Sequence, residues 1–278
     1  MKMGITLTLT RLPEQQLDLF SDAGGKVERR SPPNAGSALV ASDLEDEALI
    51  AAIAESSLAD SSVIAAEAGR RRLATAVPAL AALCRRFAGF GIGRTVPEQV
   101  AALEGLAMIG GHDAARVVSQ LIERAVVQGP VLNVAVSAAA RLRSTLSVEV
   151  LRSLLRHAEP GIRADACRCV RPSPELIGLL IDLLDDLDRT VAKAAAYALG
   201  QMGRIEALPT LKGLLRDEPT EDVIDSVLPI ADEECVVLLG RIGRSTPGLA
   251  DAALDALEGI DHPRAGAIAV AIRQLPAA

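Results

Sequence analysis

Residues 188–215 read DRTVAKAAAYALGQMGRIEALPTLKGLL, and this stretch decides the fold of the 278-residue chain. It contains an alanine-rich helix that is expected to end between Gly200 and Gly203, a short turn, and a second helix with Pro209 in its first turns. Proline is tolerated there because the first amides of a helix have no partner within the helix. The stretch therefore predicts two helices joined by a tight turn.

Related helix pairs recur along most of the chain, because four other segments align with this stretch at offsets of 31, 60, 93 and 131 residues. The longest step between units contains an insertion, GFGIGRTV, at residues 89–96. One aligned column is apolar throughout, with members 28 to 38 residues apart: Leu80, Val118, Leu151, Leu180, Leu211, Leu239 and Ile268. A period near 30 with two helices per unit predicts a solenoid, in which each pair buries its apolar face against its neighbours.

Composition favours helices as well. The chain is half hydrophobic, yet its only aromatic residues are Phe20, Phe87, Phe90 and Tyr197. Sheet proteins draw on aromatic and β-branched residues, so a β-sandwich or a barrel is excluded. Alanine and glycine allow helix backbones to approach closely. The predicted fold class is all-α.

The run DRTVAKAAAYALGQMG at residues 188–203 resembles the HEAT-like repeats of bacterial proteins, a group that includes the E-type phycobilin lyases. The resemblance implies an α-solenoid of about seven HEAT-like helix pairs over residues 42–276. It is specific for the fold and not for an activity, because such repeats serve many functions.

The segment before the repeats has a different character. Residues 21–41 are rich in Gly, Pro, Ser and charge and show no sustained period, which is typical of a linker. Ser42 and Glu45 then have the spacing of a capping box that would begin the first helix. We expect residues 1–41 to form a flexible N-terminal arm.

The arm contains the pentapeptide QLDLF at residues 16–20. It resembles the motif with which bacterial polymerases and repair proteins bind the DNA sliding clamp. The resemblance implies that Gln16 hydrogen-bonds at the edge of a clamp pocket, that Leu19 and Phe20 fill an apolar hole, and that Leu17 makes a supporting contact. Alternatively, these apolar side chains dock on the first helix pair and cover its exposed end, since terminal repeats need such caps.

Charge is distributed unevenly within the net charge of −7. Residues 61–171 contain 15 arginines against 8 acidic residues, whereas residues 172–278 contain 9 basic against 18 acidic residues. Such an asymmetry indicates a charged partner. Candidate contacts in the basic region, at helix ends that line the inner curve of related solenoids, are Arg71, Arg72, Arg141, Arg143 and Arg171.

Two readings of these arginines remain open. In the repeat alignment Arg72 and Arg143 share the column of Gly203, and a stack of guanidinium groups at one level can follow a phosphate backbone. DNA is therefore a predicted partner of region 61–171. The same arginines can instead complement the negative C-terminal ends of their helices.

The sequence shows no arrangement typical of catalysis or cofactor binding. We find no Ser/His/Asp or Cys/His set, and the four cysteines fit no metal-ligand spacing. In the run of aspartates around Leu187, Asp188 is expected to cap a helix, while Asp185 and Asp186 are expected to be solvated. We predict no enzymatic activity, no metal and no cofactor.

These observations lead to one functional hypothesis and one alternative. We expect a non-catalytic interaction scaffold whose arm binds the sliding clamp and whose inner face holds a protein or DNA during replication or repair. The alternative is a maturation factor related to the E-type lyases, which acts on a protein or chromophore with a second subunit. No apolar run reaches the roughly 18 to 20 residues of a membrane span, so we expect a cytoplasmic protein without a membrane partner.

Overall fold

The computed structural model describes residues 41–55 and 60–274, all within the second of the chain's two units, residues 40–278. Over these residues the regular elements are helices, and no strand occurs. None of these helices has the length and hydropathy of a membrane span. The α-helices are α1 (Asp46–Glu55), α2 (Ser61–Arg70), α3 (Val77–Arg86), α4 (Pro97–Ile109), α5 (Gly111–Glu123), α6 (Pro130–Arg141), α7 (Val148–Leu154), α8 (Pro160–Cys169), α9 (Pro174–Asp182), α10 (Arg189–Gln201), α11 (Leu208–Asp217), α12 (Glu221–Val227), α13 (Glu233–Ser245), α14 (Ala250–Gly259) and α15 (Pro263–Arg273). The short 3₁₀ helices are η1 (Ala41–Asp43), η2 (Ala74–Ala76), η3 (Leu183–Asp185), η4 (Ile205–Ala207), η5 (Leu228–Ile230) and η6 (Pro247–Leu249).

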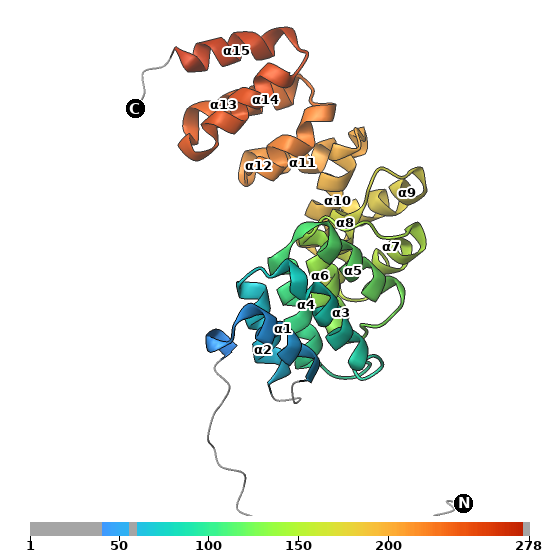
Figure 1. Ribbon diagram of the computed structural model, residues 1–278. Coiled ribbons are helices and arrows are strands. Elements are labelled where there is room, and N and C mark those ends of the chain that lie inside the picture. The colour runs from blue at the N-terminus through green and yellow to red at the C-terminus, as the bar shows by residue number, and fades with distance from the viewer. Residues whose placement is uncertain (1–40, 56–59, 275–278) are drawn as a thin grey trace, which may run out of the picture. The chain divides into compact units, whose positions relative to one another are not determined.

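The helices form two layers, one of even-numbered and one of odd-numbered helices (Figure 1). Each even-numbered helix from α2 to α14 contacts the next one, and the odd-numbered helices cover them from the other side. The described residues thus contain seven helix pairs, from α1–α2 to α13–α14, and α15 packs on both members of the last pair. The prediction of an all-α solenoid is confirmed.

Small residues bring the even-numbered helices together. A β-carbon on Gly69 of α2 would lie 2.5 Å from the Cα of Gly105 in α4. A β-carbon on Gly200 of α10 would lie 2.2 Å from the carbonyl oxygen of Ser226 in α12. Both distances are shorter than any real contact, so glycine is required at these crossings, and the backbones nearly touch.

The ends of three even-numbered helices share one backbone geometry. Gly203 follows α10 with φ +71°, while Arg72 after α2 and Arg143 after α6 have φ +55° and +50°. After α6 the amides of Arg143 and Ser144 donate to carbonyls of the last helical turn, at 3.1 and 2.9 Å. This is the left-handed helix ending that normally selects glycine. The residues that the repeat alignment placed in one column therefore occupy equivalent positions.

Two local predictions are wrong. The capping box of Ser42 and Glu45 does not form: Ser42 lies in η1, its hydroxyl donates to Asp43 Oδ1 at 3.2 Å, and α1 begins only at Asp46. Asp186 is not solvated, because both its oxygens accept hydrogen bonds from Arg163 of α8 at 2.8 Å. This bidentate pair lowers the pKa of Asp186.

The close crossing at Gly200 leads to a test of the packing. We expect Gly200→Ala to lower the free energy of unfolding by about 2–3 kcal/mol, because the new β-carbon meets backbone that cannot move away cheaply. Gly213 of α11 is a matched control, since a β-carbon there meets nothing within 4 Å. Gly213→Ala should raise stability by about 0.5–1 kcal/mol through helix propensity. Equal effects of the two variants in chemical denaturation would contradict this account.

Candidate functional site

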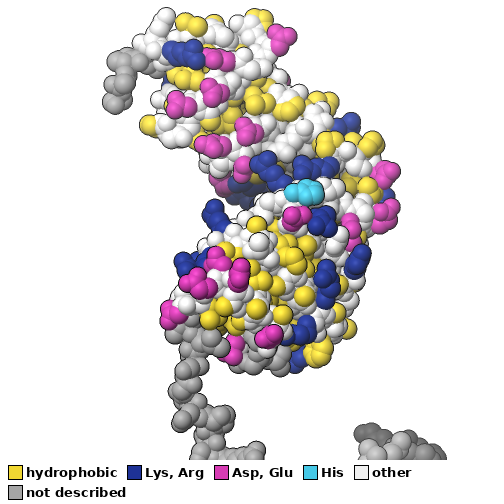
Figure 2. Space-filling view, viewed as in Figure 1, with side chains coloured by type: hydrophobic (Ala, Val, Ile, Leu, Met, Phe, Trp, Pro, Cys, Tyr) yellow, Lys and Arg dark blue, Asp and Glu magenta, His cyan; other side chains and the backbone are white. Residues whose placement is uncertain are grey.

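The candidate site is a groove of about 390 Å³ at the C-terminal ends of α6, α8 and α10, closed on one side by the first turn of α12. We call it the arginine groove. Its polar lining consists of Arg143, Ser144, Arg168, Arg171, Tyr197, Gln201 and Asp222. Figure 2 shows that Lys and Arg side chains gather over the middle of the helical array, whereas Asp and Glu predominate over α12 to α15. The groove lies where the basic and acidic parts of the sequence meet.

Arg143 is the cation of the groove that has no partner. It follows α6 in the left-handed conformation, and its exposed side chain forms no hydrogen bond or ion pair with any residue in the described part of the chain. Its carbonyl oxygen accepts a hydrogen bond from Nη2 of Arg171 at 2.9 Å. The two arginines are therefore fixed relative to each other, while the guanidinium of Arg143 stays available to a ligand.

The other side chains of the groove complete a positively charged surface. Arg168 pairs with Asp165 on the same helix at 2.5 Å, with the arginine half exposed. The ring of Tyr197 is half-buried, and the Lys193 ammonium lies 5.9 Å from its centroid. The lining contains three arginines and one acidic residue, Asp222, and of the three only Arg168 has an acidic partner in the described part of the chain. Guanidinium groups bind carboxylates through two parallel hydrogen bonds, so the groove favours an anion.

The floor of the groove contains two cysteines, Cys167 and Cys169, and both are buried. Burial raises the pKa of each thiol to about 12. The thiolate is the reactive form of cysteine, so these side chains serve as small apolar floor groups near neutral pH. Over the described residues no three His, Cys, Asp or Glu side chains come together as metal ligands.

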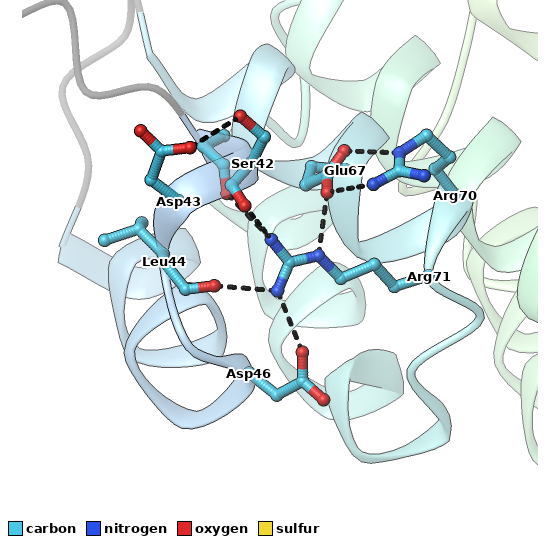
Figure 3. Close-up of polar contacts among 8 residues, drawn as sticks. Ser42, Asp43, Leu44, Asp46, Glu67, Arg70 and Arg71 are labelled. Atoms are coloured by element: carbon cyan, nitrogen blue, oxygen red, sulfur yellow. Dashed lines mark hydrogen bonds and ion pairs between the residues drawn. The ribbon is translucent and has the colours of Figure 1, made fainter.

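Arg71, unlike Arg143, is surrounded by partners within the fold (Figure 3). Its guanidinium forms ion pairs with Glu67 at 2.7 Å and Asp46 at 2.9 Å. It also donates to the backbone carbonyls of Ala41, Ser42 and Leu44, at 2.7 to 3.2 Å. Arg71 thus ties η1 and the start of α1 to the end of α2. All three nitrogens of its guanidinium donate hydrogen bonds within the fold.

The remaining predicted arginines occupy separate places. Arg72 is exposed after α2, and Arg141, the last residue of α6, lines another cavity of about 280 Å³ together with Glu104 and Asp165. The structure thus brings Arg143 and Arg171 together and separates them from Arg71 and Arg72. DNA contact by this set stays a prediction, as does clamp binding by Gln16, Leu17, Leu19 and Phe20, which lie outside the described residues.

Sequence reasoning missed Arg168, Tyr197 and Gln201 as members of the groove. Arg168 lies one turn before Arg171, and Tyr197 is the only tyrosine of the chain. The spacing of the two arginines and the single tyrosine can both be read from the sequence. Neither observation shows which side of the helix these residues lie on, or that they line the same groove.

Comparison with known proteins supports the fold. Residues 148–228 match the family model for HEAT repeats, and no curated protein matches the chain. A similar solved structure is the complex of CpcE and CpcF of phycocyanin lyase from Nostoc sp. PCC7120, with 17% identity and a TM-score of 0.49, covering 87% of this chain and 97% of the matched chain. Residues 148–228 therefore contain HEAT repeats. At this identity the likeness to the lyase complex concerns the fold alone.

These findings correct the prediction about enzymatic activity and bear on the predictions of function and partner. The prediction that the chain is not an enzyme is contradicted, because the similar complex is a lyase. A non-catalytic role is therefore withdrawn. The matched complex also belongs to the class that the sequence analysis gave as its alternative, whereas neither comparison supports a sliding clamp or DNA as partner.

The ion pairs of Glu67 lead to a test at acidic pH. Hydrogen bonds from Arg70 and Arg71 lower the pKa of Glu67 from its ordinary 4.5 to about 2. The stability that this carboxylate contributes is complete above about pH 5 and is lost as the pH falls toward 2. We expect Glu67→Gln to lower the free energy of unfolding by about 1–2 kcal/mol at pH 7. The difference from the unmodified chain should shrink toward zero between pH 5 and 2. A difference in melting temperature that is constant over this range would contradict the assignment.

Proposed function

We propose that this chain binds an acidic segment of a partner protein in the arginine groove. The observation that carries the proposal is the guanidinium of Arg143, which lines the groove without an acidic partner in the described part of the chain. Repeat solenoids present extended surfaces of stacked helices to their partners. The arginine groove is a place on the even-numbered helices where such a surface has both a cavity and unpaired charge.

The backbone of Arg143 supports this role. A non-glycine residue in the left-handed conformation costs roughly 1–2 kcal/mol, and glycine occupies the equivalent position after α10, at Gly203. Residues in this conformation cluster at functional sites, and Ala125 after α5 shares it. Arg72 has the same strained backbone but lies outside the groove. A substitution at Arg72 therefore shows how the backbone change alone affects ligand binding.

A protein segment suits the groove better than DNA does. The lining includes the apolar side chains of Ala140, Ala194 and Ala198, which offer no hydrogen bond to a phosphate. A duplex backbone needs cations spread along many phosphates, but Arg71 is already bound within the fold. An acidic peptide can contact both kinds of lining residue: its carboxylates pair with the arginines, and its apolar atoms pack against the alanines.

The two strained arginines provide a matched test of this proposal. We expect Arg143→Gly to weaken the binding of a fluorescein-labelled octaglutamate peptide about tenfold, because one charge-assisted pair is lost. Arg72→Gly removes the same charge from the same backbone geometry and should leave binding within twofold. Neither variant should lower the melting temperature, since glycine relieves the strain.

The readout is fluorescence anisotropy at low and moderate salt, with a labelled single-stranded oligonucleotide of similar length as competitor. Equal peptide affinities of Arg143→Gly and the unmodified chain would overturn the proposal. Tighter binding of the oligonucleotide than of the peptide, lost in Arg143→Gly, would replace it by nucleic-acid binding.

From the sequence motif we also propose that residues 16–20 bind a sliding clamp. The support is the full match of QLDLF to the clamp-binding pattern. Tethering a short motif beside a second binding surface raises the effective concentration of each contact. This contact is separate from the arginine groove and is tested separately.

A synthetic peptide of residues 10–24 should bind a bacterial sliding clamp with a Kd in the low-micromolar range or somewhat weaker, as expected for a short motif with few anchoring side chains. Replacing Gln16, Leu19 and Phe20 by alanine should abolish this binding, which calorimetry measures. The same triple change in the whole chain should leave its melting temperature unchanged. A drop of several degrees would instead identify the motif as a cap of the first helix pair.

A further inference from the structure

The connection between α3 and α4 contains the insertion of residues 89–96, and buried contacts fix its base. The side chain of Gln99, only 1% exposed, donates from Nε2 to the carbonyl oxygens of Cys84 at 3.0 Å and of Phe87 and Val126 at 3.3 Å. On its other side the loop backbone lies against Gly129, where a β-carbon would come within 2.1 Å of the Gly91 carbonyl oxygen. The loop is therefore held from three segments.

This fixed base presents two apolar side chains to solvent. Phe90 is 55% exposed and Ile92 70% exposed. Nothing lies within 4 Å of the positions that β-carbons on Gly89 and Gly93 would take, so the loop is open to solvent on both sides of Gly91, which is itself buried against Gln128 and Gly129. Phe90 also contacts the buried Phe87 edge to face, with ring centroids 6.1 Å apart. Phe90 therefore packs against the end of α3 on one side and leaves about half of its surface to solvent.

Arginines lie close to the two phenylalanine rings. Arg94 lies over the Phe90 ring at 5.9 Å, and Arg86 over the Phe87 ring at 5.3 Å. Residues 85–96 contain three arginines and no acidic residue. Exposed apolar side chains inside a cationic collar match a surface that is negatively charged outside and apolar just beneath.

We propose that this loop docks on the surface of an anionic lipid bilayer. Phe90 and Ile92 would enter the boundary between headgroups and acyl chains, while the arginine collar would contact the anionic headgroups. A bilayer accepts a protruding tip without a shaped pocket. This contact lies on the surface, so it requires no spanning helix, and it is independent of the arginine groove.

The absence of tryptophan from the chain provides a clean probe. We expect the single-tryptophan variant Phe90→Trp to show a blue-shifted and brighter emission with vesicles of phosphatidylcholine containing 30% phosphatidylglycerol, and no change with phosphatidylcholine alone. Adding Arg94→Gln should lower the partition coefficient about fivefold, the effect of one cation near an anionic surface. Far-UV circular dichroism checks that every variant keeps its helix content.

A second variant controls for tryptophan itself. Leu187 is fully exposed between Asp186 and Asp188, so its collar is acidic. The emission of Leu187→Trp should stay at the position of solvated tryptophan with both vesicle types. An unshifted Phe90→Trp spectrum with the anionic vesicles at low salt would overturn the proposal. A pocket on a partner protein would then be the alternative binding site for the loop. An equal shift in Leu187→Trp would overturn it as well.

Discussion

The structure depends on how closely the even-numbered helices approach one another. At the crossing of α10 and α12 the Ser226 carbonyl oxygen occupies the space next to Gly200 where any side chain would begin, and α2 meets α4 in the same way at Gly69 and Gly105. These contacts fix the spacing of the layer and place the C-terminal ends of its helices side by side. The arginine groove lies between helix ends that this spacing brings together.

The arginines at these helix ends show that surroundings, not residue type, set the role. Arg71 and Arg143 both follow an alanine-rich helix, but η1 and Glu67 provide Arg71 with acids and carbonyls at hydrogen-bond distance. No such segment covers the end of α6 in the described part of the chain, and Arg143 keeps its charge unpaired. One arginine therefore fastens the first helix pair, and the other is left for a ligand.

The sequence was sufficient for the fold because the repeat period and the small residues are local signals. The end of α10 and the equivalence of Arg72, Arg143 and Gly203 followed from alignment alone. The groove was predicted only in part, since an alignment compares positions along one helix and does not reveal that Tyr197 and Arg168 line the same cavity. The prediction of no enzymatic activity rested on missing motifs, and such motifs are a weak guide because repeat proteins can assemble a site from distant units.

The side chain of Gln99 has a consequence for how the molecule comes apart. The main contacts of each helix reach no more than two helices along the chain, so an array of this kind frays from its ends and unzips repeat by repeat. Gln99 joins the end of α3 to the approach of α6 through three carbonyl groups. Unfolding that starts at either end should pause at these three hydrogen bonds. The segment from α3 to α6 would then be the last to lose its structure.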